Sequence, residues 1–274
     1  MKFICACYSK TGTKTLALAL RQLGFTCDDL AEHMDKYQYW NRIYVSDPND
    51  PIAQTPEIFK EMYADVDACT DTPSYLFWEQ ILEAFPDAKV ILIERDEDKW
   101  ADSLQKHFEK ERKDNKGGWF FLYFPRQLMQ LLSHQVWLGQ AQLRDLMWGQ
   151  VVGHLSPYGP NRCNMMMARK RYREHNAYVK LKCPKDKLLV YNFKDGYEPL
   201  AKFCGVTENI PTGPLPRENV GGTIIDDILE RHPRVVQDKQ QFMRNLLIFM
   251  ASFVVIVYFV VRACYLVYFK HLFG

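Results

Sequence analysis

The first 24 residues constrain the fold most, because they read as a strand, a polar turn and a helix in direct succession. Residues 2–8 are mostly apolar and partly β-branched or aromatic, which favours a strand. Residues 9–15, Ser-Lys-Thr-Gly-Thr-Lys-Thr, form a turn, and strong helix formers follow up to Gly24, which suits a helix end. In such a unit the N–H groups of the turn and of the first helical turn converge on one point. The sequence therefore predicts an anion-binding loop at residues 9–15; an ordinary turn with surface lysines is the alternative.

Strands and helices alternate along the following residues. Further strands are predicted at residues 24–27, 64–70, 89–94 and 187–191, with helical patterns between them. The run Lys89–Glu94 is continuous enough to be buried on both faces of a sheet. This alternation predicts an α/β fold, a P-loop-type parallel sheet flanked by helices, over residues 1–220.

The C-terminal end has a different composition. Residues 246–269 are almost wholly apolar and carry one charged residue, Arg262. About 20 apolar residues cross a bilayer core, so a transmembrane helix is predicted at 246–269, with a juxtamembrane linker at 221–245. A buried core helix is the alternative. Because no signal segment opens the sequence, we expect a tail anchor in the endoplasmic reticulum or mitochondrial outer membrane, with the globular domain facing the cytosol.

Charge and cysteine content narrow the function classes. Lysine plus arginine (35) nearly balances aspartate plus glutamate (33), so no nucleic-acid partner is expected and any anion site must be local. The eight cysteines have no zinc-type spacing, and we interpret them as reduced thiols. No metal is expected.

A second anion-binding pattern begins at the end of the strand predicted at residues 89–94. Arg95 follows that strand, and Ser103 lies eight residues later on the next predicted helix. Ligands of open parallel sheets bind at the carboxyl ends of the strands. An arginine fork and a hydroxyl can therefore converge there on one phosphate group.

The two patterns together resemble the PAPS-dependent sulfotransferases. The turn is similar to their loop, Pro-Lys-Ser-Gly-Thr-Thr in cytosolic enzymes and Arg-Thr-Gly-Thr in a divergent branch, although Ser9 replaces proline or glycine and Lys14 replaces a hydroxyl residue. Arg95 and Ser103 match the segment that binds the 3′-phosphate. Residues 71–100, 196–205 and 215–219 resemble later blocks of the divergent branch, in the same order.

The resemblance implies an enzyme that moves a sulfonate group from PAPS to a hydroxyl of a small acceptor. The predicted membrane anchor adds the expectation that this acceptor is lipophilic and is met at a membrane surface. The resemblance also implies that Lys10 stabilises the leaving group and that Asp71 is the general base. For Asp71 an N-cap or turn role is the alternative, and four histidines are weaker candidates for the base: His33, His107, His134 and His154. The implied cosubstrate ligands are Thr11, Gly12, Thr13, Lys14, Thr15, Arg95, Ser103 and Arg217.

Two rival functions stay open. An inactive, membrane-tethered nucleotide-binding or interaction module could share the fold. A P-loop kinase fits less well, because Thr13 separates Gly12 from Lys14. Aromatic residues at 37–40 and 119–124 could line an acceptor pocket, and the basic run 169–173 could meet lipid or cosubstrate; core packing and a solvated helix face are the plainer interpretations.

Overall fold

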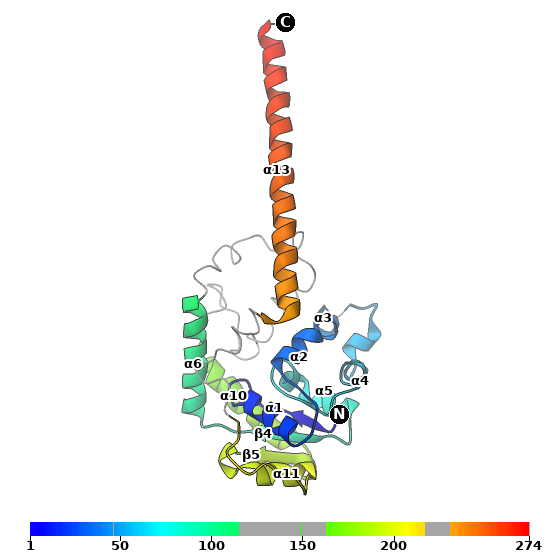
Figure 1. The fold of residues 1–274 in the computed structure, drawn as a ribbon, viewed down its shortest axis with the longest axis vertical. Coiled ribbons are helices and arrows are strands. Elements are labelled where there is room, and N and C mark those ends of the chain that lie inside the picture. The colour runs from blue at the N-terminus through cyan, green and yellow to red at the C-terminus, as the bar shows by residue number, and fades with distance from the viewer. Residues whose placement is uncertain (46, 115–148, 150–162, 217–230, 274) are drawn as a thin grey trace.

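The protein folds as an α/β domain from which one long C-terminal helix extends (Figure 1). The computed structural model describes residues 1–45, 47–114, 149, 163–216 and 231–273. In these residues five parallel strands form one sheet in the order β2-β3-β1-β4-β5. The strands are β1 (Phe3–Cys5), β2 (Cys27–Asp28), β3 (Ala68–Cys69), β4 (Lys89–Ile93) and β5 (Leu188–Tyr191). The predicted α/β class with a parallel sheet is therefore confirmed.

Helices connect the strands and cover both faces of the sheet. The α-helices are α1 (Thr13–Gln22), α2 (Leu30–Asp35), α3 (Tyr37–Val45), α4 (Glu57–Met62), α5 (Trp78–Ala84), α6 (Glu97–Asp114), α10 (Met165–Lys182), α11 (Tyr197–Cys204) and α13 (Pro233–Phe273). Short 3₁₀ turns are η1 (Pro51–Gln54), η2 (Ser74–Phe77), η4 (Lys185–Lys187) and η5 (Phe193–Asp195).

Several predicted elements differ from the structure in their bounds, and the strand predicted at 24–27 lies at Cys27–Asp28. Only Ala68 and Cys69 of the strand expected at 64–70 pair with β1, because Ala64 and Asp65 are exposed in a turn. The helical pattern predicted between the strands at 64–70 and 89–94 does not begin as an α-helix. The Ser74 hydroxyl donates to the carbonyl oxygen of Asp71, at 2.8 Å, and the segment begins as a 3₁₀ turn. This local hydrogen bond engages a hydroxyl that could otherwise cap a helix.

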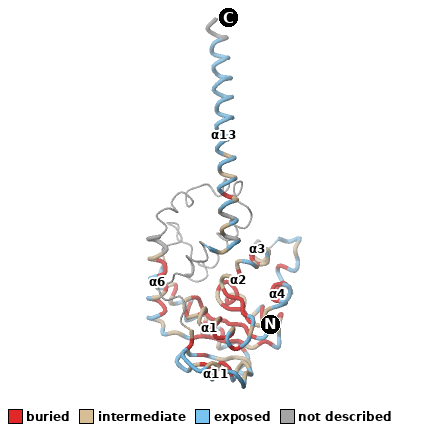
Figure 2. The backbone as a smooth tube through the Cα atoms, in the orientation of Figure 1, coloured by how far each residue is buried: buried red, intermediate tan, exposed pale blue. Residues whose placement is uncertain are grey.

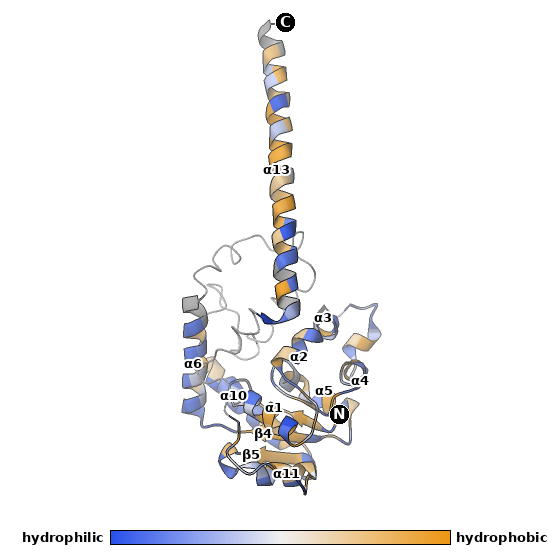
Figure 3. Ribbon diagram, in the orientation of Figure 1, coloured by the Kyte–Doolittle hydropathy of each residue, from blue (hydrophilic) through white to orange (hydrophobic). Residues whose placement is uncertain are grey.

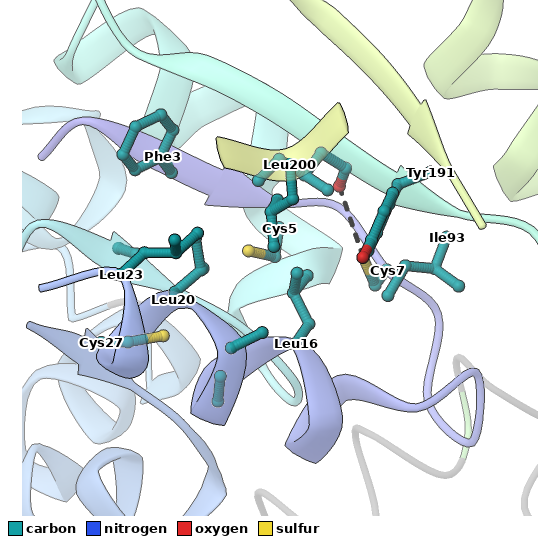
Figure 4. Close-up of a cluster of buried hydrophobic side chains, with 14 of the residues drawn as sticks. Phe3, Cys5, Cys7, Leu16, Leu20, Leu23, Cys27, Ile93, Tyr191 and Leu200 are labelled. Carbon is teal, nitrogen blue, oxygen red and sulfur yellow. Dashed lines mark hydrogen bonds between the residues drawn. The ribbon is translucent and has the colours of Figure 1, made fainter. Parts of the chain in front are cut away.

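Alternate residues of the central strands point to opposite layers, as a strand buried on both faces requires. Phe3, Cys5 and Cys7 pack with α1 and α11 in one core cluster, which Figure 4 shows. Ile4 and Ala6 pack on the other face with α3, α4, α5 and α10. Figure 2 shows this buried centre within the domain, with α13 extending away from it and exposed along most of its length. Trp40 lies in the second cluster, 1% exposed, so core packing and not pocket lining explains it.

The cysteines are free thiols, as predicted. Cys7 lies just after β1 and donates from Sγ to the carbonyl oxygen of Ile91, at 3.4 Å (Figure 4). Burial raises the pKa of Cys7 to about 12, so this thiol stays protonated and unreactive near neutral pH.

The C-terminal helix α13 continues without a break from the polar linker into the apolar segment. The most apolar 18-residue window of its segment Gln240–Phe269 has a mean hydropathy of 2.5, and none of that window is buried. Figure 3 shows hydrophilic turns at its start and largely hydrophobic turns beyond them. By length and composition this is a candidate membrane span, and its exposure rules out the buried core helix considered from the sequence.

Candidate functional site

The predicted anion loop joins β1 to α1 at the carboxyl edge of the sheet. We name Tyr8–Gly12 the β1–α1 loop. Two of its residues have left-handed backbone conformations, Lys10 with φ 70° and Gly12 with φ 110°. Gly12 is the N-cap of α1 and has no side chain to cap it. The N–H groups of the first turn of α1, from Thr13 to Thr15, are therefore left to bind an external acceptor such as a phosphate group.

Gly12 also meets a steric requirement from another strand. A Cβ atom at this position would lie 2.4 Å from Cε2 of Phe193, in η5 just after β5. Real Cβ contacts are essentially never this short, so a larger residue at position 12 would force the Phe193 ring to move. The loop thus packs against the residues that follow the edge strand β5.

The β1–α1 loop is held by two residues that follow the neighbouring strand β4: Arg95, just beyond the strand, and Trp100, on α6. Arg95 lies two residues beyond β4, and its Nη1 donates to the carbonyl oxygen of Lys10 at 2.9 Å. Trp100, on α6, donates from Nε1 to the carbonyl oxygen of Ser9 at 2.8 Å. Arg95 therefore contacts the loop through the loop backbone, and its predicted convergence with Ser103 on one phosphate stays a prediction.

The remaining carbonyl contacts of this region come from within the loop and from α10. The Thr11 hydroxyl donates to the carbonyl oxygen of Tyr8 at 2.6 Å. His175, which sequence reasoning did not single out, donates from Nε2 to the carbonyl oxygen of Ala6 at 2.9 Å. Burial lowers the pKa of His175, so the ring is neutral and acts as a fixed donor. The protein's own donors thus satisfy the carbonyl groups of Ala6, Tyr8, Ser9 and Lys10, while the first N–H groups of α1 are left for a ligand.

Asp71 lies beside the loop because β3 pairs with β1 in parallel. It follows β3 with a left-handed φ of 65°. Its Oδ2 accepts from the Thr13 hydroxyl at 2.8 Å, and its Oδ1 accepts from the Thr72 backbone N–H at 2.8 Å. The Thr72 and Ser9 hydroxyls are 2.8 Å apart and join the same two segments. The predicted base and the predicted loop are therefore neighbours.

Lys14 contacts a carboxylate that the sequence reasoning missed. Its Nζ lies 3.0 Å from Oδ2 of Asp29, whose side chain is 3% exposed. Burial raises the pKa of Asp29 to about 6 and the charge of Asp71 adds to the rise, while Lys14 opposes it. Asp29 follows β2, which ends at the same edge of the sheet as β3. Its place after a predicted strand is the feature of the sequence that could have identified it as a site residue. Lys14 therefore neutralises a protein carboxylate in this structure.

Two of the four histidines considered as bases, His33 and His107, lie in the described part of the chain. His33, on α2, is buried and donates from Nε2 to the carbonyl oxygen of Thr70 at 2.9 Å, which ties α2 to the end of β3. Burial lowers its pKa. His107 is buried on α6. His134 and His154 lie outside the described residues.

The other predicted site residues are less tightly placed. Ser103 is half-buried on α6, and among the described residues it makes no hydrogen bond to the loop. Arg217 and the aromatic run 119–124 lie outside the described residues. In the basic run of α10, Arg169 and Arg173 form ion pairs with Glu97, at 3.2 and 2.7 Å. This face of α10 is therefore a paired surface of the domain.

The sheet order, with the loop following the central strand and uncapped N–H groups beyond it, defines a P-loop-type α/β protein. The family model of the sulfotransferase domain matches residues 2–224. The chain therefore belongs to the sulfotransferase family. It is also similar to Ava biosynthesis cluster protein M of Aspergillus versicolor, at 27% identity over 225 residues, which covers 74% of this chain and 75% of that protein.

Proposed function

We propose that this protein is a PAPS-dependent sulfotransferase that transfers a sulfonate group to a hydroxyl of a small, lipophilic acceptor. One observation carries the proposal: in a chain of this family, the uncapped start of α1 lies between Lys10 on the loop and Asp71 just after the neighbouring strand β3. Family membership supports the choice of cosubstrate, and the local geometry supports the choice of residues.

Each residue has a role that follows from its chemistry. PAPS supplies the sulfonate group, whose departure leaves negative charge on a phosphate oxygen. The Lys10 ammonium would offset that charge. Asp71 would take up the proton of the acceptor hydroxyl, and its hydrogen bonds from Thr13 and Thr72 hold the carboxylate in one orientation.

The cosubstrate ligands fall into two groups. Backbone N–H groups at Gly12, Thr13, Lys14 and Thr15 would bind the 5′-phosphate at the helix start, with the side chains of Thr11, Thr13, Lys14 and Thr15 near them. Arg95, Ser103 and Arg217 would bind the 3′-phosphate. Because one Arg95 nitrogen already holds the loop, Arg95 would link the two phosphate sites.

A nucleotide-binding experiment tests the proposal. In the detergent-solubilised full chain, 3′,5′-adenosine bisphosphate at a hundred times its Kd should stabilise the fold by about 2.7 kcal/mol, or about 5–10 °C in Tm. Arg95→Ala should lose most of this shift, because it removes a phosphate ligand and a donor to the loop. ATP with magnesium should give no comparable shift.

Arg173→Ala is the matched control, since it removes an exposed arginine that pairs with Glu97 outside the loop. No shift with the bisphosphate would contradict the proposal. Binding without turnover on any acceptor pool would favour the inactive module instead, and magnesium-dependent stabilisation by ATP would favour a kinase.

The acceptor class and the location rest on α13. We propose the division into a sulfotransferase domain at 1–220, a linker at 221–245 and a membrane anchor at 246–269, with the domain facing the cytosol at the endoplasmic reticulum or the mitochondrial outer membrane. The exposed apolar surface of α13 supports this, because water does not tolerate so long an apolar helix alone. An anchored enzyme would meet acceptors dissolved in the lipid.

Two charge pairs placed on the same helix test the anchor. Val255→Asp with Phe259→Asp should release the chain from membranes on alkaline washing, since each charge costs about 2.5–3.5 kcal/mol at a membrane centre. Gln237→Asp with Gln241→Asp, before the apolar segment, should leave it bound. Equal release of both variants would contradict the anchor.

A further inference from the structure

Two of the donors that hold the β1–α1 loop meet at one residue of α10, Tyr172. Its ring is 3% exposed and lies within the cluster formed by α6, α10 and the start of the loop. The hydroxyl accepts from the backbone N–H of Arg95 at 2.9 Å and donates to the carbonyl oxygen of the same residue at 2.7 Å. The ring stacks on Trp100, with centroids 4.3 Å apart and planes at 11°.

Both contacts fix groups that would otherwise move. Arg95 lies beyond the last paired residue of β4, so no strand ladder holds its backbone. The Tyr172 hydroxyl satisfies both backbone groups of Arg95 and so fixes the origin of its side chain. Stacking likewise fixes the plane of the Trp100 ring, and with it the direction of the Nε1–H bond to Ser9.

We propose that Tyr172 is a positioning residue for the β1–α1 loop. Through Arg95 and Trp100 it fixes the positions of the Lys10 and Ser9 carbonyl groups, and thereby the direction of the N–H groups at the start of α1. Its predicted effect on nucleotide affinity rests on the function proposed above. Its predicted effect on the loop itself does not, because the contacts involve the protein alone.

Tyr172→Phe is the decisive variant, because it removes both hydrogen bonds to Arg95 and keeps the stacked ring. Tyr178→Phe is its matched control. Tyr178 lies on the same helix, and its hydroxyl donates to Oε2 of Glu79 at 2.7 Å on an exposed surface away from the loop. Both variants of the full chain should fold, which their melting curves would establish.

Amide hydrogen exchange of the peptide spanning residues 8–16 gives a readout without any ligand. We expect about tenfold faster exchange there in Tyr172→Phe, with the strands β3 and β5 unchanged, and no local effect in Tyr178→Phe. The Kd for 3′,5′-adenosine bisphosphate should rise about tenfold in Tyr172→Phe, in line with two lost hydrogen bonds. Tyr172→Leu, which loses the stacked ring as well, should raise it further.

Unchanged loop exchange in Tyr172→Phe would overturn the proposal. Faster exchange throughout the domain would also overturn it, since it would show a general packing role. If the wild-type chain binds no bisphosphate, the proposed function fails, while the exchange measurement still decides whether Tyr172 positions the loop.

Discussion

Replacing Lys10 by methionine should lower kcat for sulfonate transfer by about 100- to 1,000-fold, while the Kd for 3′,5′-adenosine bisphosphate changes by less than about tenfold. Removing one donor that stabilises developing charge costs other enzymes a similar factor. Methionine keeps the length of the side chain and the same left-handed backbone penalty at φ 70°, so the variant isolates the ammonium. Transfer of labelled sulfonate from PAPS into a lipid extract measures the effect.

Lys60→Met is the control for losing one lysine. Lys60 lies on α4, is half exposed and pairs with Glu57 at 2.8 Å, away from the loop. It should keep wild-type turnover. If Lys10→Met retained more than about a tenth of the wild-type kcat, Lys10 would not be the group that offsets the leaving charge.

Replacing Gly12 by alanine should lower the free energy of unfolding by about 2–5 kcal/mol and abolish bisphosphate binding. Left-handed backbone in an L-residue costs about 1–2 kcal/mol, and overpacking adds about 1–3 kcal/mol. The overpacking arises because the new Cβ would lie 2.4 Å from the Phe193 ring. Urea unfolding measures the first effect, and a thermal shift with the bisphosphate measures the second.

Gly24→Ala separates the two costs. Gly24 has a comparable φ of 91°, but a Cβ there would meet nothing within 4 Å, so we expect only the backbone penalty. A cycle with Phe193→Leu tests the clash itself: Gly12→Ala should cost about 1–3 kcal/mol less when the ring is gone. Equal costs for Gly12→Ala with and without the ring would refute the steric explanation.

The fold was predictable because its signals are local. The apolar run at 89–93 and the strand, turn and helix at the start of the chain each favour one structure from their own residues. Parallel pairing then brings the ends of β1, β3 and β4 to one edge, which is why Lys10, Asp71 and Arg95 could be assigned to one region. Their predicted catalytic and binding roles are still predictions.

Contacts between distant segments could not be predicted in this way. The Lys14–Asp29 pair joins α1 to the end of β2, and no local pattern predicts which carboxylate Lys14 contacts. Tyr172 lies 77 residues from Arg95, within a basic run whose charges dominate the local pattern. The bounds of the two-residue strands β2 and β3 likewise depend on which residues of the neighbouring strands pair with them.

The sequence by itself determined the α/β class, the turn between the first strand and the first helix, and the apolar helix at the C-terminus. Each depends on periodicity or composition within one segment. Only the tertiary structure decided that the Arg95 guanidinium holds the Lys10 carbonyl, that Lys14 neutralises Asp29, and that Gly12 must be small because Phe193 covers it. These contacts depend on how helices and loops pack on the sheet, and packing is a property of the whole chain.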